Sequence, residues 1–596
     1  MNTSYSIALE KAKTLPGLFQ ERVRLTPNKI AYQYFNTEKK TWEQLNWADM
    51  DTQLKRWQIA LIKENLNRGD RVAIMLPNCP EWVLADQAAL SLGLVIVPLY
   101  VSDRAENILY ILKDSNVKLL IIKNSRQWQE VKQGASLDDL NKVVSLTQAE
   151  NNESESKLYI MDQWLPLHGE EIALPPCEPN DLATIVYTSG TTGNPKGVML
   201  SHHNILWNAN SSLQRVPIYP EDSLLSFLPL SHMFERTLGY YLPMMVGASV
   251  SYARAPTKVA EDLVTLKPTA MISVPRVYER IYDKIHQTLE KKPKWVKYLF
   301  RLAIASGWQQ FRAQQKQIPW HPLCLLYPLL KSKVSQPILD QFGGNIRVAV
   351  CGGAALSYDI SKEFLALGVP LLQGYGLTEA SPTISANAAD NNDPHSIGMP
   401  LQDVEVKVEN TGELLVRSPG VMLGYWNNPQ ATTEIIDKNH WLHTGDQVRI
   451  DQNRIYITGR IKEIIVLTNG EKIPPAEMET VIGMDPLFDQ VMVVGEHKPY
   501  LAALIVLNSE GWTELSKNLD LTPHQEKSLK HPEIIKQVLG RVKLHTRSFP
   551  GYAKIRNVFL TLTPWTIENG LLTPTLKIRR NKILSQYQRQ IDDLYS

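Results

Sequence analysis

Residues 188–197 read Thr-Ser-Gly-Thr-Thr-Gly-Asn-Pro-Lys-Gly and have the composition of a phosphate-binding loop. Glycines let backbone amides approach a phosphate, four hydroxyls can donate to its oxygens, and Lys196 adds a positive charge. The apolar run 182–187 predicts a buried strand that leads into the loop. The pattern is not a Walker A loop, because Pro195 and Gly197 flank the lysine. A plain surface turn is the alternative, but the ordered ten-residue string favours nucleotide phosphate.

A second glycine-containing motif spans residues 373–379, Gln-Gly-Tyr-Gly-Leu-Thr-Glu, and follows a strand-like run at 370–372. Tyr375 offers an aromatic face for a base, Thr378 a hydroxyl for a phosphate, and Glu379 a hard oxygen ligand for Mg²⁺. Taken alone, the motif can equally be a structural junction between a strand and a turn.

Three shorter motifs follow along the chain. Thr-Gly-Asp at 444–446 supplies Asp446, a natural acceptor for two ribose hydroxyls, although such a tripeptide is usually only a turn. Gly-Arg-Ile-Lys-Glu occupies 459–463, and Leu-Thr-Pro-Thr-Leu-Lys occupies 572–577 near the carboxyl end. A lone Lys577 would normally be a solvated charge, so the order of the motifs carries more information than any single one.

The elements that must position these motifs follow an α/β pattern. Strand-like runs at 72–76, 95–99 and 119–122 alternate with helical segments such as 81–92, which predicts stacked, mostly parallel sheets. A second series at 272–274, 348–350 and 370–372 ends in or near glycines, where α/β sheets place their ligands. Beyond residue 404 valines alternate with polar residues, which predicts an antiparallel, β-rich subdomain.

Two domains are expected, because single cores stop growing near about 250–300 residues and the chain has 596. We place a large N-terminal domain at 1–460 and a small, mobile α+β domain at 461–596, joined near 460–462. Within the second, Asn469-Gly470 predicts a hairpin with a type I′ turn. A basic helical insertion is expected at about 288–345.

Composition sets mild bounds on partners. The net charge is +2, from 63 basic and 61 acidic side chains, so nothing suggests a nucleic-acid partner. The four cysteines are far apart, the amino terminus lacks a signal-peptide pattern, and no apolar run is long enough to cross a bilayer. A cytoplasmic protein is expected.

In order and spacing, the five motifs resemble the adenylate-forming (AMP-binding) superfamily, which includes acyl-CoA synthetases, firefly-type luciferases and non-ribosomal adenylation domains. The resemblance covers about residues 41–577, and the phosphate loop and the Tyr-Gly-Leu-Thr-Glu box are its most specific parts. It implies ATP and Mg²⁺ as cofactors, with an acyl-adenylate formed first and then attacked by a thiol. An oxygenase of the luciferase type has the same motifs, and a non-catalytic nucleotide-binding relative is a remote alternative.

The resemblance also implies roles, residue by residue. Thr378 would contact the α-phosphate, Glu379 would bind Mg²⁺ with Thr188 beside it, and Lys577 would bridge the substrate carboxylate and the α-phosphate. The residues implied to hold the β- and γ-phosphates are Thr188, Ser189, Gly190, Thr191, Thr192, Gly193 and Lys196.

The remaining implied roles concern the nucleoside and the hinge. Asp446 would take the ribose hydroxyls, Arg460 would steady the ribose and phosphate side, and Lys462 stands at the hinge of the small domain. The residues implied to enclose adenine are Gly353, Ala354, Ala355, Gln373, Gly374, Tyr375 and, next to them, Gly376.

The acid and the thiol are suggested by other segments. Residues 228–236, Leu-Pro-Leu-Ser-His-Met-Phe-Glu-Arg, resemble a segment of long-chain fatty acyl-CoA synthetases that borders the acyl tunnel. His232 would there contact the fatty carboxylate; a packed core histidine is the alternative. Coenzyme A is the expected co-substrate, and an acyl carrier protein is the alternative acceptor.

The insertion is compositionally unusual. Residues 291–347 hold ten Lys or Arg and one acid, Asp340, and aromatic residues are interleaved with the basic ones. Such a segment can lie on an anionic membrane, which would make the protein peripheral on the inner face, or can dock an acidic carrier protein. The alternative is a solvated helical insertion with its aromatic residues in the core. The aromatic residues interleaved there include Trp295, Phe300, Trp308, Phe311 and Trp320.

Overall fold

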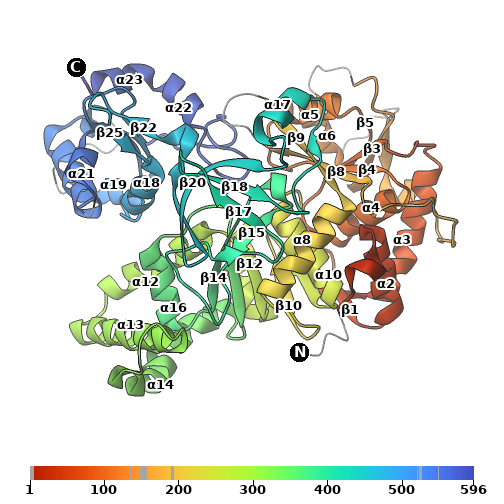
Figure 1. Cartoon of the computed structure of the whole chain (residues 1–596), viewed down its shortest axis with the longest axis horizontal. Helices are drawn as coiled ribbons and strands as arrows, with labels where there is room; N and C mark the ends of the chain where they lie inside the picture. The colour runs from red at the N-terminus through yellow and green to blue at the C-terminus, as the bar shows by residue number, and fades with distance from the viewer. Residues whose placement is uncertain are drawn as a thin grey trace.

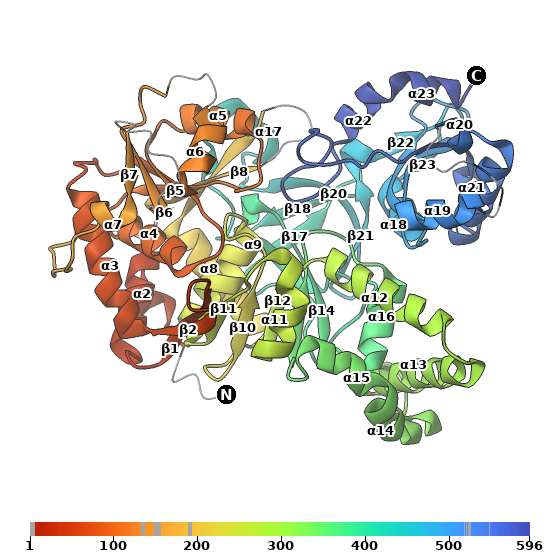
Figure 2. The same cartoon turned by 180° about the vertical axis from the view of Figure 1, so that it is seen from behind.

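Two large sheets with helices packed between them form the body of the molecule (Figures 1 and 2). The computed structural model describes residues 6–132, 137–147, 157–188, 194–517, 519, 521, 526–547 and 549–596. The first sheet has nine strands in the order β16-β15-β14-β13-β12-β10-β11-β1-β2 and is parallel from β14 to β1. Its strands are β1 (Ile30–Asn36), β2 (Thr41–Asn46), β10 (Ser223–Ser226), β11 (Ser249–Tyr252), β12 (Ala270–Ser273), β13 (Val348–Cys351), β14 (Leu371–Gly376), β15 (Thr383–Ala386) and β16 (Met399–Pro400).

The second sheet has eight strands in the order β19-β9-β8-β4-β3-β5-β6-β7. It is parallel from β8 to β7, whereas β9 pairs antiparallel with both β8 and β19. Its strands are β3 (Arg71–Met75), β4 (Val95–Pro98), β5 (Val117–Asn124), β6 (Lys142–Thr147), β7 (Leu158–Ile160), β8 (Leu182–Thr188), β9 (Lys196–Ser201) and β19 (Gly424–Tyr425).

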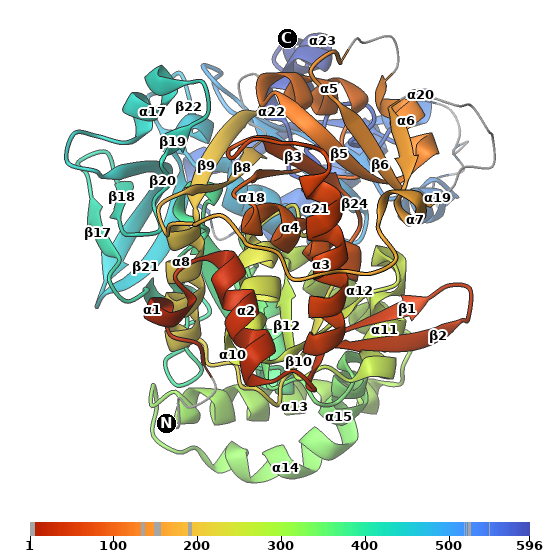
Figure 3. The same ribbon diagram turned by 90° about the vertical axis from the view of Figure 1, so that its right-hand side faces the viewer.

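One apolar core joins the two sheets through the helices between them. It includes residues of β3 and β10 together with α2 (Leu15–Leu25), α4 (Pro80–Ser91), α8 (His202–Arg215) and α10 (Leu242–Val246). Figure 3 shows α2, α8 and α10 beside the strands they cover. Because α4 is buried nearly all round, its apolar residues are spread around the helix rather than confined to one stripe.

A four-stranded antiparallel sheet forms the predicted β-rich subdomain. Its order is β17-β18-β20-β21, with β17 (Glu405–Val408), β18 (Glu413–Arg417), β20 (Leu442–Asp451) and β21 (Arg454–Arg460). The β20–β21 pairing sets Asp446 opposite Arg460. The predicted fold class, stacked mostly parallel sheets with a β-rich subdomain, is confirmed.

The segment after Arg460 has its own core and lies apart from the body in Figure 1. A three-stranded sheet, β24-β25-β26, is covered by α18 (Pro475–Ile482), α19 (Ser509–Lys517), α21 (Pro532–His545) and α22 (Arg580–Gln586). Its strands are β24 (Phe488–Val494), β25 (Leu501–Leu507) and β26 (Ile555–Thr561). This confirms the small α+β domain, while the exact boundary at 460/461 stays a prediction.

The hairpin predicted at Asn469-Gly470 is present between β22 (Ile465–Val466) and β23 (Lys472–Ile473). The predicted type I′ turn is wrong. That turn needs positive φ at both central residues, but Gly470 has φ +84° and Asn469 is not in the left-handed region. The Gly470 amide bonds to the Leu467 carbonyl, so the glycine ends the turn instead of lying in its centre.

The basic insertion forms helix α13 (Lys294–Gln314), followed by η3 (Pro322–Leu326) and α14 (Tyr327–Leu330). Phe300 and Phe311 are buried, as the core alternative predicts, whereas Trp295 and Trp320 are exposed. Figures 1, 2 and 3 all place α14 at the end of the molecule opposite the carboxyl-terminal helix α23 (Gln588–Asp593). Within the described residues, no helix is both long enough and apolar enough to cross a membrane.

Candidate active site

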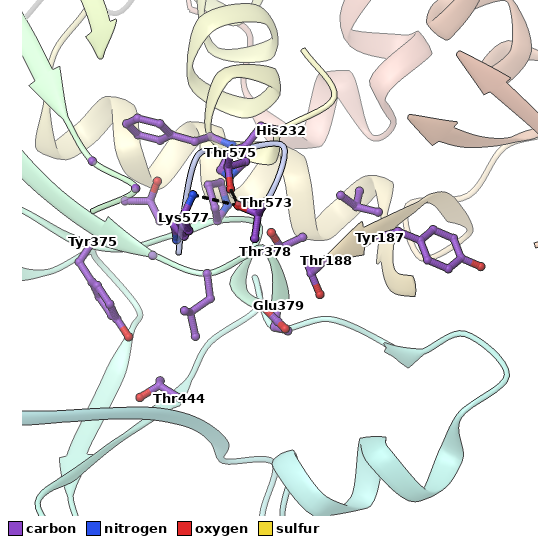
Figure 4. A pocket seen from close by; sticks show the side chains of 18 of the residues that line it. Tyr187, Thr188, His232, Tyr375, Thr378, Glu379, Thr444, Thr573, Thr575 and Lys577 are labelled. Carbon is purple, nitrogen blue, oxygen red and sulfur yellow. Dashed lines mark hydrogen bonds between the residues drawn. The ribbon is translucent and has the colours of Figure 1, made fainter. Parts of the chain in front are cut away.

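A cavity of about 670 Å³ lies where the large domain meets the small domain, and all five motifs contribute described residues to its wall (Figure 4). Carboxyl ends of parallel strands line it: Thr188 at the end of β8, Val350 near the end of β13 with Gly352 and Gly353 just after it, and the end of β14. The small domain contributes Lys577 from the opposite side. Such an edge is where α/β sheets bind ligands, so separate parts of the sequence converge for a structural reason.

The phosphate motif begins and ends on paired strands. Thr188 lies opposite Lys196 in the β8–β9 ladder, and both residues line the cavity. The predicted phosphate ligands Ser189, Gly190, Thr191, Thr192 and Gly193 lie outside the described residues, so their roles stay predictions. The ladder holds the two ends of the loop at one place on the cavity wall.

Tyr425 connects the predicted metal ligand to the phosphate lysine. Its hydroxyl donates to Glu379 Oε1 at 2.9 Å, and Lys196 Nζ lies 5.1 Å from the centroid of its ring. Burial and the Glu379 carboxylate raise the pKa of Tyr425, so the phenol stays protonated and keeps donating. Figure 4 shows Glu379 and Thr188 on adjoining sides of the cavity.

Tyr375, Asp446 and Arg460 form a linked set. The Tyr375 hydroxyl donates to Asp446 Oδ2 at 2.5 Å, and Arg460 Nε donates to Asp446 Oδ1 at 2.8 Å. Tyr375 and Arg460 line the cavity, whereas buried Asp446 lies behind its lining neighbours Thr444 and Gly445. Each carboxylate oxygen of Asp446, the predicted ribose ligand, therefore accepts one hydrogen bond from a neighbouring side chain in this conformation.

The predicted adenine residues are only partly brought together. Gly353, Gly374 and Gly376 line the cavity with Tyr375. Gly353 has φ +81°, a conformation that favours glycine. The Gln373 side chain instead donates to the Pro394 carbonyl at 2.7 Å. Ala354 and Ala355 are exposed and do not line the cavity. The roles of these three residues stay predictions.

Lys577 reaches the cavity on a short loop of the small domain. The loop is closed by the Leu572–Ile578 bridge, and Thr573 Oγ1 accepts from the Lys577 amide at 3.0 Å and contacts Thr575 Oγ1 at 2.9 Å. The ammonium keeps access to solvent inside the cavity, yet protein atoms enclose it on most sides. This enclosure and the charge of Arg460 lower the pKa of Lys577. Lys462 lines the same cavity.

His232 lies at the start of α9 (Met233–Glu235), on the cavity wall. Its Nδ1 accepts from the Phe234 amide at 3.2 Å, so Nδ1 carries no proton and Nε2–H is the available donor. Burial, helped by the nearby charge of Lys577, lowers the pKa of His232 to about 4. A neutral histidine in this position can donate one hydrogen bond to a carboxylate without titrating near pH 7.

Comparison with known proteins agrees with this geometry. The family of AMP-binding enzymes matches residues 19–426, and the C-terminal domain of AMP-binding enzymes matches residues 462–596. The chain belongs to the AMP-binding enzyme family. The predicted resemblance to the adenylate-forming superfamily is confirmed.

Relatives of known name extend over nearly the whole chain. A long-chain-fatty-acid–CoA ligase (ACSBG2) of Rattus norvegicus is 28% identical over 98% of this chain and 93% of its own. Fatty acyl-CoA synthetase A of Dictyostelium discoideum is 30% identical over 90% of this chain and 83% of its own. The crystal structure of anthranilate CoA ligase AuaEII in complex with anthranoyl-AMP has a TM-score of 0.74 at 19% identity, covering 99% of this chain and all of that one. The last likeness shows the shared fold.

In this AMP-binding enzyme the cavity also has an apolar limb. We use this name for the apolar part of its wall, which is formed by residues just after α8, by β10 and β12, and by the helical segment after His232. Its lining side chains include Val216, Ile218, Leu224, Leu238, Leu242 and Ile272. A limb of this composition provides no partner for a charged group and suits a hydrocarbon chain.

A buried ion pair stabilises the helical segment that forms part of the wall of that limb. Arg236 begins a π-helical turn (Arg236–Tyr241), bonds to Asp86 on α4, and donates to Thr184 Oγ1 on β8 at 2.9 Å. Both charged side chains are fully buried, and Tyr240 and Tyr241 also donate to Asp86. The network therefore connects the segment that carries His232 to the second sheet.

Glu235, next to that network, is buried and its Oε2 has no hydrogen-bond partner among the described residues. Burial raises its pKa to about 8. Gly239 makes room for the carboxyl group, because a Cβ there would lie 2.5 Å from Glu235 Oε1. Glu235 therefore carries its proton at neutral pH.

Two features of the site could not be found from the motifs: the position of Tyr425 and the hydrogen bond made by Thr573. Tyr425 belongs to no recognised string, and only the β9–β19 pairing brings it to Lys196 and Glu379. Thr573 was visible within residues 572–577, but its function in closing the lysine loop depends on a bond that a sequence does not show.

Proposed function

We propose that this enzyme activates a long-chain fatty acid with ATP, releasing pyrophosphate, and transfers the acyl group from the adenylate to the thiol of coenzyme A. The supporting observation is that one cavity is lined both by Lys196, Glu379 and Lys577 and by the side chains of the apolar limb. His232 lines the same cavity. A fatty acid in the limb would present its carboxylate at the nucleotide end.

The first step needs positive charge more than a base. The carboxylate is already ionised near pH 7, but it must approach a polyanionic nucleotide. Lys577 would neutralise charge between the carboxylate and the α-phosphate, and His232 Nε2–H would orient the acid. Fixed cations of this kind contribute roughly 3–4 kcal/mol each to lowering such a barrier.

The residues present fit a magnesium ion. Glu379 uses one oxygen for the Tyr425 hydroxyl, which leaves its other oxygen for a hard cation, and the Thr188 hydroxyl is nearby on the cavity wall. Mg²⁺ bound there would offset phosphate charge. Asp446 accepts one hydrogen bond on each oxygen, from Tyr375 and Arg460, and each oxygen can accept a further bond from a ribose hydroxyl.

The second step needs room for a thiol where Lys577 now stands. The lysine loop belongs to a domain with a separate core, so rotation about 460–462 would withdraw it without disturbing the phosphate site. Coenzyme A is the acceptor we favour, in agreement with the names of the relatives. An acyl carrier protein is the second candidate.

We also place the enzyme in the cytoplasm, in peripheral contact with the membrane through the basic insertion. Its substrate partitions into lipid, so access to a membrane surface would supply the acid.

Release of pyrophosphate, followed across fatty acids of increasing length with coenzyme A or carrier protein as acceptor, tests the proposal. We expect release that depends on fatty acid and Mg²⁺, greater turnover with long chains than with octanoate, and thioester formation with coenzyme A. Absence of pyrophosphate with every fatty acid would refute the activity, and turnover with carrier protein alone would replace the acceptor.

A further inference from the structure

The insertion exposes large apolar side chains at one end of the molecule. Trp295 and Tyr298 are 65% and 67% exposed near the start of α13, and Leu325 and Leu329 are each 70% exposed, about one helical turn apart. We call this surface the α13–α14 face. Its members are Trp295, Tyr298, Trp320, Leu325, Leu326 and Leu329. Exposed apolar side chains gathered on one segment of a globular protein mark an interaction site.

The inner side of α13 explains why these side chains stay outside. Phe300, Ala303 and Phe311 are buried, and a Cβ on Gly307 would lie 1.9 Å from the Ala366 carbonyl oxygen. Helix α13 is therefore seated tightly on α16 (Tyr358–Leu367), and η3 is tied to it by the bond from Ser306 Oγ to the Leu323 carbonyl. The exposed side chains therefore belong to a segment whose inner side is packed on the body of the protein.

The charged side chains of the segment from 291 to 333 all have one sign. Among the described residues, none of the nine Lys and Arg side chains at 291–333 forms an ion pair, and the only acid of the segment, Asp340, lies beyond them. Surface lysines elsewhere in the chain, such as Lys39 and Lys258, pair with glutamates. The exposed basic residues of the segment are Lys291, Lys292, Lys294, Arg301, Lys316 and Lys333.

We propose that the α13–α14 face docks the enzyme on a lipid surface that contains anionic headgroups, an inference that rests on and deepens the proposed function. Trp and Tyr favour the headgroup level, leucines can enter the acyl region, and each lysine near the surface is attracted to anionic lipid. An acidic protein partner would satisfy the charge but gives less reason for two exposed tryptophans and three leucines. Docking in this way turns the small domain away from the lipid, since α14 and α23 lie at opposite ends in all three views.

Co-sedimentation with vesicles tests the proposal. One set contains phosphatidylcholine alone, and the other contains phosphatidylcholine with phosphatidylglycerol. We expect the full-length protein to bind the anionic set at least tenfold more tightly, and to lose most of that binding between 50 and 500 mM salt. Equal binding to both sets, or none, would overturn the proposal.

Matched variants locate the surface. Leu325→Ser with Leu329→Ser, and separately Lys291→Glu with Lys294→Glu, should each weaken vesicle binding at least tenfold. The control is Leu167→Ser with Leu544→Ser, which removes two leucines that are 87% and 61% exposed outside the insertion and should leave binding unchanged. If control and test variants weaken binding alike, the assigned face is wrong.

Two further measurements separate the possible failures. Pyrophosphate release with octanoate in detergent-free buffer should be the same in all these variants, because the substrate is already in solution. If no variant or wild type turns over any acid, the proposed function fails while vesicle binding can still stand. If the face variants lose binding to an immobilised acidic carrier protein but wild type ignores anionic vesicles, the partner is a protein and the lipid proposal is refuted.

Discussion

The hydroxyl of Tyr425 donates to Glu379 Oε1 at 2.9 Å while its ring lies under Lys196 Nζ at 5.1 Å. One side chain thus positions the predicted metal ligand and the phosphate lysine, although the three residues are far apart in the sequence. Tyr425 is a positioning residue, and its effect should appear in the response to metal.

Tyr425→Phe keeps the ring and removes only the hydroxyl. A hydrogen bond to a carboxylate contributes about 1.5–3 kcal/mol, so we expect adenylation to slow about tenfold and the Mg²⁺ concentration needed for half-maximal pyrophosphate release to rise. Tyr159→Phe, at a surface tyrosine, is the control. An unchanged Mg²⁺ dependence would exclude this role.

Lys577→Ala should slow the first half-reaction and leave the second nearly unchanged. Loss of a fixed cation at about 3–4 kcal/mol predicts adenylate formation slowed a hundredfold or more, while thioester formation from supplied acyl-adenylate stays within about threefold of wild type. Lys582→Ala, an exposed lysine five residues on, is the control. Normal adenylate formation with impaired thioester formation would show that Lys577 acts in the second step instead.

His232→Asn retains an oxygen that can accept from the Phe234 amide and removes the Nε2 donor. We expect adenylation to fall about tenfold. Because the pKa of His232 is about 4, the ratio of wild-type to variant rate should stay constant from pH 6 to 8. His168→Asn serves as the exposed control. A ratio that changes several-fold near pH 6.5 would mean that His232 titrates during catalysis.

Glu235→Gln tests the buried carboxyl group. The pKa of Glu235 is about 8 in the folded protein against 4.5 when unfolded, so the folded state binds more protons and its stability falls as pH rises from 4.5 to 8. Between pH 6 and 8 the wild type should lose about 2 kcal/mol more free energy of unfolding than the variant. Urea unfolding at both pH values measures this, with exposed Glu221→Gln as control. If wild type and Glu235→Gln lost the same free energy of unfolding between pH 6 and 8, the pKa of Glu235 would not be near 8.

Ile218→Trp tests the apolar limb. Ile218 is buried and lines the cavity, so a larger side chain should shorten the space for the acyl chain and shift the preferred fatty acid to shorter lengths. Ile62→Trp, at an exposed isoleucine, should leave the preference unchanged. An unaltered length profile for Ile218→Trp would show that the chain lies elsewhere.

Much of the fold could be predicted because its signals are local. Apolar runs of strand length alternating with helices predict the stacked sheets, and the carboxyl ends of those strands predict where Thr188, Glu379 and Tyr375 meet. The order of the motifs also predicts that Lys577 acts with them, even though it comes from another domain.

What could not be predicted depends on side-chain direction and on pairing between distant segments. Gln373 lies inside a recognised motif, yet its amide bonds to the Pro394 carbonyl. Composition alone could not predict which aromatic residues of the insertion are buried and which are exposed. Phe300 is buried and Trp295 is exposed because one side of α13 packs on α16. Asn469 shows the limit for turns: the dipeptide predicts a hairpin, but tertiary context selects the turn.

The Asp86–Arg236 pair has a consequence for sequence divergence. Removing one member would strand the other charge in the interior at a cost of about 3–5 kcal/mol, whereas exchanging both for apolar residues can be nearly neutral. Substitution of either residue alone is therefore expected to be selected against. Among homologues the two sites should covary, with a lineage that has lost the acid having also replaced the guanidinium and, with it, the contact to Thr184.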